Sequence, residues 1–110
     1  MDYRYLYRLS ALIVVMFTLS TLQVLSQDPH DVYNEGISFY SDGDFESAIT
    51  TWEKLVSSGY SSYELFYNLG NANFKAGSIP GSILYYEKAL LLKPFNEDIR
   101  YNLGIATTYV

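Results

Sequence analysis

The chain has 110 residues, a formal net charge of −5, no cysteine and an aromatic content of 17%. The lack of cysteine excludes a disulfide framework, thiol chemistry and cysteine metal sites. The acidic balance, without a basic patch, argues against nucleic-acid binding. The length allows one small domain, for which a single hydrophobic core is marginal.

The first 26 residues differ in composition from the rest. Arg4 and Arg8 precede an uncharged, mostly apolar run over residues 9–25. This order is typical of a secretory signal peptide, here with cleavage after Ser26. The run is long for a signal peptide and short for a membrane span, so an uncleaved signal anchor is an alternative. In both cases we expect the rest to be exported, either periplasmic or anchored in the inner membrane and facing the periplasm.

A first pair of helices follows. Apolar residues at steps of three and four predict helices over residues 29–41 and 45–57. Gly43 lies in the turn between them, Asp44 is a good N-cap, and Gly59 marks the end of the second helix. Six residues are predicted to face inward between these helices: Val32, Gly36, Phe39, Ile49, Trp52 and Val56.

A second pair of helices, over residues 65–94, has the same organisation. Ser78 is a good N-cap for its second helix, and Pro80 falls in the first turn, where a missing N–H costs little. Pro94 ends that helix. A last helix is predicted over residues 97–109, starting with acidic side chains that suit the helix dipole.

The two pairs repeat with a period of 34 residues. Tyr33-Asn34 recurs as Tyr67-Asn68 and Tyr101-Asn102. A helix-turn-helix unit at this period is the pattern of tetratricopeptide repeats. Further matched positions are Gly36, Gly70 and Gly104, Ile49 and Ile83, and Trp52 and Tyr86.

The chain therefore resembles the tetratricopeptide family over residues 29–110. Repeat 1 covers residues 29–62, repeat 2 covers 63–96, and residues 97–110 form the first helix of a third repeat. The resemblance implies an all-α fold, an antiparallel helix-turn-helix solenoid wound as a right-handed superhelix. Two interpretations of the last helix remain open. It is either a solvated final helix or, as we expect, the point where a longer protein has been truncated.

Glycine in the middle of the first helices has a physical reason. Gly36 and Gly70 cost about 1 kcal/mol each against alanine, which is tolerable if a second helix approaches closely. We expect small residues to face these glycines and large ones to fill the space further along. The small residues are Ala48 and Ser82, and the large ones are Trp52 and Tyr86. Glu35 stands where repeat 2 has Leu69, which fits an end helix with no neighbour before it.

No catalytic constellation is found in the sequence. His30, the single histidine, lies at the start of a helix without an orienting partner. Asp42 and Asp44 flank a glycine but lack the later acidic ligand of a calcium loop. The sequence therefore predicts neither an enzyme nor a cofactor or metal site.

What remains is a binding surface. The resemblance implies a concave groove lined by the first helix of each pair, which takes extended peptides or partner helices. We expect Tyr33, Tyr67 and Tyr101 to lie in a row there, because tyrosine suits binding surfaces. Trp52 and Tyr86, on the second helices, are expected to lie away from it. The predicted groove residues are Tyr33, Ile37, Tyr40, Ser41, Tyr67, Asn71, Phe74, Lys75, Tyr101, Ile105 and Thr108.

Within the family, residues 65–77 and 83–103 are similar to the tetratricopeptide members of the Bacteroidetes aerotolerance operons. This resemblance implies an envelope scaffold with von Willebrand A-type partners and a role in stress tolerance. Two other functions stay open. In the first, the chain is the recruiting domain of a longer exported enzyme whose catalytic region lies beyond Val110. In the second, it is a structural bundle that stabilises an oligomer.

Overall fold

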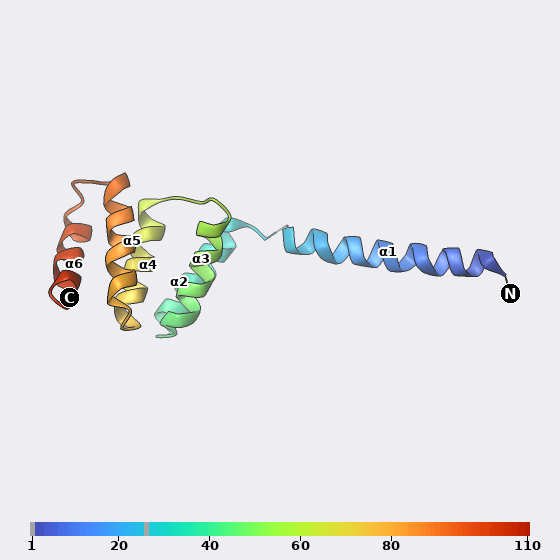
Figure 1. Cartoon of the computed structure of the whole chain (residues 1–110), viewed down its shortest axis with the longest axis horizontal. Helices are drawn as coiled ribbons and strands as arrows, with labels where there is room; N and C mark the ends of the chain where they lie inside the picture. Colours follow the sequence, from blue (N-terminus) through green and yellow to red (C-terminus); the bar gives the residue numbers. More distant parts are fainter. Residues whose placement is uncertain (1, 26) are drawn as a thin grey trace.

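The computed structural model describes residues 2–25 and 27–110, and the regular elements in these residues are all helices. The predicted cleavage position, Ser26, lies outside the described residues. Figure 1 shows α1 extending away from an array formed by the other five helices. The helices are α1 (Tyr3–Leu25), α2 (Pro29–Ser41), α3 (Phe45–Ser57), α4 (Tyr63–Lys75), α5 (Ile79–Leu92) and α6 (Glu97–Thr107).

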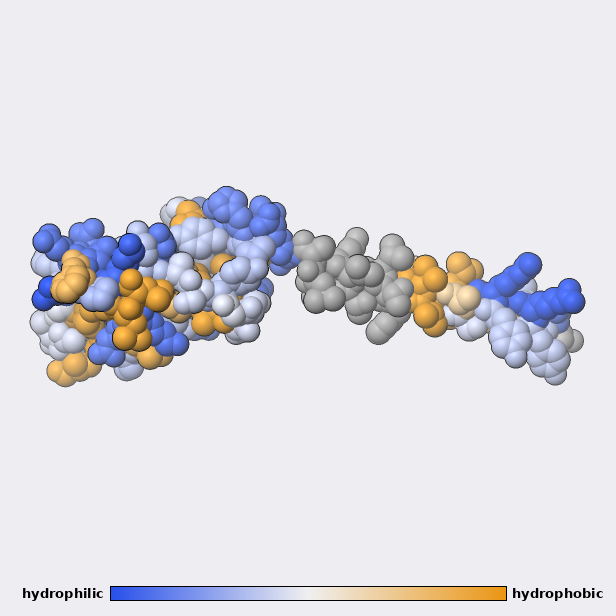
Figure 2. All heavy atoms as spheres, turned by 90° about the horizontal axis from the view of Figure 1, so that it is seen from above, coloured by the Kyte–Doolittle hydropathy of each residue, from blue (hydrophilic) through white to orange (hydrophobic). Residues whose placement is uncertain are grey.

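The N-terminal helix α1 presents apolar side chains to solvent. Figure 2 shows a hydrophobic stretch on its described part, in contrast to the mixed surface of the array. Within the residues searched, no helix combines the length and the apolar character needed to cross a membrane. The exposed apolar residues of this stretch are Leu9, Leu12, Ile13, Val14, Val15 and Met16.

The array begins with the helix boundaries that the sequence predicts. Both α2 and α3 start and end at the predicted residues. The Oδ1 atom of Asp44 accepts a hydrogen bond of 3.1 Å from the Ser47 backbone N–H, which confirms its N-cap role. The last helix, α6, ends at Thr107, two residues before the predicted end. There the N–H of Tyr109 bonds to the carbonyl of Ala106, three residues back, which closes a turn.

Glycines with left-handed backbone conformation end three of the helices. Gly43, Gly59 and Gly77 have φ angles of 79°, 91° and 82°, a region that costs residues with a Cβ more than glycine. Ser78 occupies the N-cap position of α5 as predicted, but its hydroxyl makes no capping hydrogen bond. Its backbone N–H instead donates to the Asn73 carbonyl at 2.8 Å, which ties the turn to α4.

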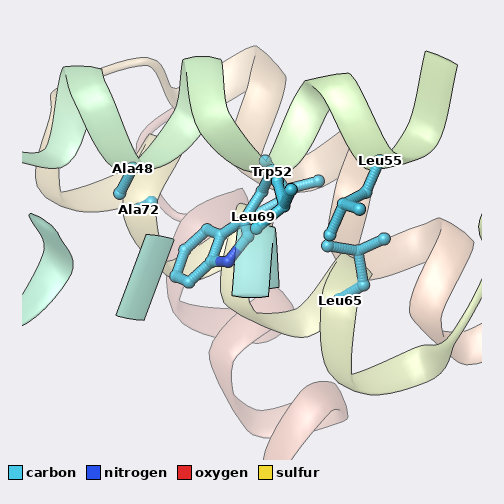
Figure 3. Close-up of a cluster of buried hydrophobic side chains, with 7 residues drawn as sticks. Ala48, Trp52, Leu55, Leu65, Leu69 and Ala72 are labelled. Atoms are coloured by element: carbon cyan, nitrogen blue, oxygen red, sulfur yellow. The ribbon is translucent and has the colours of Figure 1, made fainter. Parts of the chain in front are cut away.

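Each helix of the array packs against the next one in the chain. Figure 3 shows the core between α3 and α4, where Leu55 and Leu65 point toward one another. Glu35, at the position that Leu69 takes in repeat 2, is exposed, whereas Leu69 is fully buried. The exposure of Glu35 agrees with the prediction that no helix packs on α2 from the N-terminal side. The labelled core residues are Ala48, Trp52, Leu55, Leu65, Leu69 and Ala72.

The two mid-helix glycines lie against the aromatic rings of Trp52 and Tyr86. A Cβ on Gly70 would lie 2.5 Å from two ring carbons of Tyr86, and a Cβ on Gly36 would overlap the indole of Trp52. Because glycine has no side chain, it leaves space on the first helix of each pair. The aromatic ring from the second helix fills that space. The small residues expected to face these glycines, Ala48 and Ser82, are fully buried.

Replacing Ser82 with alanine is expected to raise the free energy of unfolding by about 1 kcal/mol. Its Oγ is the one buried side-chain polar atom among the described residues that has no hydrogen bond, and burying an unpaired hydroxyl is unfavourable. Urea denaturation followed by circular dichroism measures the change. Ser38→Ala, an exposed change within α2, is the control for helix propensity alone. A destabilised Ser82→Ala variant would contradict the prediction.

Candidate functional site

A pocket of about 280 Å³ opens on the face formed by α2, α4 and α6, the first helices of the repeats. Seven residues line it, of which the sequence predicted five as groove residues: Tyr40, Asn71, Phe74, Lys75 and Ile105. The two others were missed, namely Tyr86 and Asn102. The first helices of three successive repeats thus contribute to one pocket. The phenol of Tyr86, which belongs to α5, lines it as well.

A hydrogen-bond network joins three residues of the pocket, Asn71, Tyr86 and Asn102, to Tyr67. The Tyr86 hydroxyl donates to Oδ1 of Asn71 at 2.6 Å. Nδ2 of Asn102 donates to the same Oδ1 at 3.2 Å and to the Tyr67 hydroxyl oxygen at 2.9 Å. The expectation that Tyr86 lies away from this face is therefore wrong, because its long side chain reaches across from α5.

The network leaves hydrogen-bonding groups of both asparagines unused. Among the described residues, Nδ2 of Asn71 and Oδ1 of Asn102 have no hydrogen-bond partner. Neither is a buried unpaired atom, so both are accessible to solvent. The pocket therefore offers an amide N–H and an amide C=O from two adjoining side chains.

Two of the tyrosines that recur every 34 residues, Tyr33 and Tyr67, join neighbouring repeats. The Tyr33 hydroxyl oxygen accepts a hydrogen bond of 2.7 Å from Nδ2 of Asn68, as Tyr67 does from Asn102. Tyr33 and Tyr67 are half-buried and do not line the pocket, and Tyr101 is 71% exposed. These hydroxyls serve the contact between repeats. The remaining predicted groove residues, which also do not line the pocket, are Ile37, Ser41 and Thr108.

The two missed residues differ in how far the sequence could have revealed them. Asn102 belongs to the Tyr-Asn pair that recurs every 34 residues, so its recurrence was a usable signal. Tyr86 had no such signal, because helical periodicity gives the direction of a side chain and not its reach. Lys75, at the pocket edge, is exposed and is the single charged residue in the lining.

Raising the pH above 10 is expected to destabilise the array. Burial raises the pKa of Tyr86 far above the ordinary 10.0, and burial with nearby Glu53 raises that of Tyr85 to about 12. Unfolded tyrosines lose their protons first, near pH 10, so stability is present below that pH and is lost toward pH 12. Urea denaturation at pH 8, 10 and 11 measures the loss. Tyr86→Phe should flatten the dependence, whereas the exposed control Tyr101→Phe should not.

Comparison with known proteins agrees with the architecture. Residues 33–106 match the tetratricopeptide repeat family, and the match covers well over half of the chain. The chain belongs to the tetratricopeptide repeat family. Repeats of this family generally mediate protein-protein interaction, and domains built from them are typically non-catalytic scaffolds. The comparison with curated proteins gives no match.

Proposed function

We propose that this chain is a non-catalytic scaffold that holds an extended segment of a partner protein in the pocket between α2, α4 and α6. The observation that carries the proposal is the pair of unused amide groups on Asn71 and Asn102. Every peptide unit other than one at proline carries one N–H and one C=O. A partner's backbone can therefore satisfy both groups without any particular side chain.

The rest of the pocket sets a preference for side chains. Tyr40, Phe74 and Ile105 offer apolar and aromatic surface, which supplies most of the binding energy in small interfaces. Lys75 adds a positive charge at the edge, which favours a carboxylate on the partner. The segment that fits best carries an apolar side chain and an acidic one.

We further propose that the scaffold works in a bacterial cell envelope, as a relative of the aerotolerance operon protein BatE with von Willebrand A-type partners. Two features of the sequence support this proposal. Residues 96–103 are similar in sequence to that group, and residues 1–26 have the composition of a signal peptide. Mass spectrometry of the chain recovered from envelope fractions should show that it begins at Gln27. A chain that retains Met1 would contradict cleavage and favour the signal anchor.

The groove is tested by capture of envelope proteins on the purified chain. Lys75→Glu combined with Ile105→Arg should reduce capture of a von Willebrand A-type protein at least tenfold, because both residues line the pocket. Lys54→Glu makes the same charge change on α3, outside the pocket, and should retain the partner. Thermal melts must show that both variants are folded. Equal capture by the groove variant and the wild type would refute the proposed site.

A further inference from the structure

The pocket between α2, α4 and α6 contains two amides whose hydrogen-bonding groups are divided between the protein and the solvent. Oδ1 of Asn71 accepts from the Tyr86 hydroxyl at 2.6 Å and from Nδ2 of Asn102 at 3.2 Å, which uses both of its lone pairs. Nδ2 of Asn102 donates to that oxygen and to the Tyr67 hydroxyl oxygen at 2.9 Å, which uses both of its hydrogens. Asn71 therefore presents only N–H groups to the pocket, and Asn102 presents only its carbonyl oxygen.

The direct contact between the two amides keeps them complementary. If the amide of Asn71 alone turned over, its Nδ2 would face Nδ2 of Asn102, and two donors would oppose each other at 3.2 Å. A phenol hydroxyl can donate or accept, so Tyr67 and Tyr86 also permit both amides to turn over together. In either arrangement one asparagine shows a donor to the pocket and the other shows an acceptor.

An unlike pair of this kind matches one residue of an extended chain. The N–H and the C=O of the same residue point to the same side of a β-strand, and in an antiparallel ladder both bond to one neighbour. The residues on either side point their backbone groups the other way. One residue of a partner can thus bond to both asparagines, with its side chain beside the apolar lining of Tyr40, Phe74 and Ile105.

We propose that Tyr86 is a positioning residue whose hydroxyl makes the pocket select an extended residue with a free backbone N–H and reject proline or any other residue without one. The inference rests on the proposed function, because it concerns the same pocket. Without that hydroxyl, Oδ1 of Asn71 keeps only the 3.2 Å bond from Asn102 among the bonds of this network. Asn71 can then swing away, and the amide of Asn102 is free to turn and place its N–H where the acceptor stood.

The test uses two small probes with the full-length chain. The first is N-acetyl-leucine N-methylamide, which has both backbone groups and an apolar side chain. The second is its depsipeptide analogue, in which an ester oxygen replaces the leucine N–H and the rest is unchanged. Titration followed by NMR of the Asn71 and Asn102 side-chain amides gives both dissociation constants. We expect the wild type to bind the first probe about tenfold more tightly, because the ester oxygen has no hydrogen to donate to the Asn102 carbonyl.

Substitution of Tyr86 separates positioning from support of the fold. Tyr86→Phe keeps the ring beside Gly70, and it should reduce the ratio of the two dissociation constants to about threefold or less. A role in the fold alone would weaken both probes equally and leave this ratio unchanged. The control is Tyr85→Phe on the same helix, which loses a hydroxyl hydrogen bond to Glu53 outside the pocket and should keep the wild-type ratio. Asn102→Leu removes the acceptor directly and should abolish the preference, which keeps the test decisive if Tyr86→Phe does not fold.

Different results would overturn this inference and the proposed function. An unchanged ratio in folded Tyr86→Phe, or equal affinity of the wild type for both probes, would refute the role of Tyr86 and leave the groove as the binding site. A preference that Asn102→Leu retains would also refute it, since the N–H would then bond elsewhere. Absence of saturable binding, or binding that Lys75→Glu with Ile105→Arg leaves unchanged, would refute the proposed site and the inference with it.

Discussion

Replacing Trp52 with alanine is expected to lower the free energy of unfolding by about 3–5 kcal/mol. The side chain is 1% exposed, and its Nε1–H donates to the Tyr33 carbonyl at 3.0 Å. Its ring centroid lies 6.2 Å from that of Tyr33 and 6.1 Å from that of Tyr40. Because the indole also fills the space beside Gly36, truncation leaves a cavity between α2 and α3. Urea denaturation followed by circular dichroism measures the loss.

The control for this prediction is Trp52→Phe. Phenylalanine keeps a ring beside Gly36 but loses the N–H donor, so the expected loss is smaller, about 1–3 kcal/mol. An equal loss in both variants would mean that the hydrogen bond, and not the volume of the ring, sustains the packing. A loss below about 1 kcal/mol for the alanine variant would contradict the buried position itself.

Replacing Gly70 with leucine is expected to unfold repeat 2 or destabilise it by well over 1–3 kcal/mol, the usual range for overpacking. Even the first added carbon would lie 2.5 Å from the Tyr86 ring, which is 2% exposed. Thermal melting gives the midpoint. Gly104→Leu is the matched control at the equivalent position of α6. It should raise stability by about 0.5–1 kcal/mol, because leucine is the better helix former and the space is open.

The contact between glycine and ring can be isolated by a double-mutant cycle in repeat 1. Gly36→Ala should be strongly destabilising in the wild type and close to neutral in the Trp52→Ala background, where the clashing ring is gone. Additive effects of the two substitutions would show that the clash is relieved by backbone movement, and that the ring does not hold α2 and α3 at their distance.

Much of the fold could be predicted from the sequence because its determinants are local. The boundaries of α2 and α3 follow from Asp44, the glycines in the turns and the spacing of apolar residues. The 34-residue period then gives the second pair without further assumptions. The end of α6 was less predictable, because residues 108–110 contain neither glycine nor proline to stop a helix.

The contacts between helices were less predictable than the helices themselves. Periodicity identified Gly36 and Trp52 as inward-facing, but it did not indicate that they meet each other, since a tryptophan spans more than one helical turn. The same limit applies to the pocket. Its residues on the first helices follow from their shared face, whereas the reach of Tyr86 depends on the distance between α4 and α5.

The hydrogen bonds from Asn68 to Tyr33 and from Asn102 to Tyr67 join residues 35 apart in both cases. A duplication of residues 63–96 within the gene would therefore reproduce every such bond, with the new asparagine placed opposite Tyr67. An insertion within one of the paired helices would turn the tyrosine or the asparagine away from its partner. The array can thus be lengthened by whole units without loss of these bonds, and each added unit would bring another tyrosine-asparagine pair to the contact between repeats.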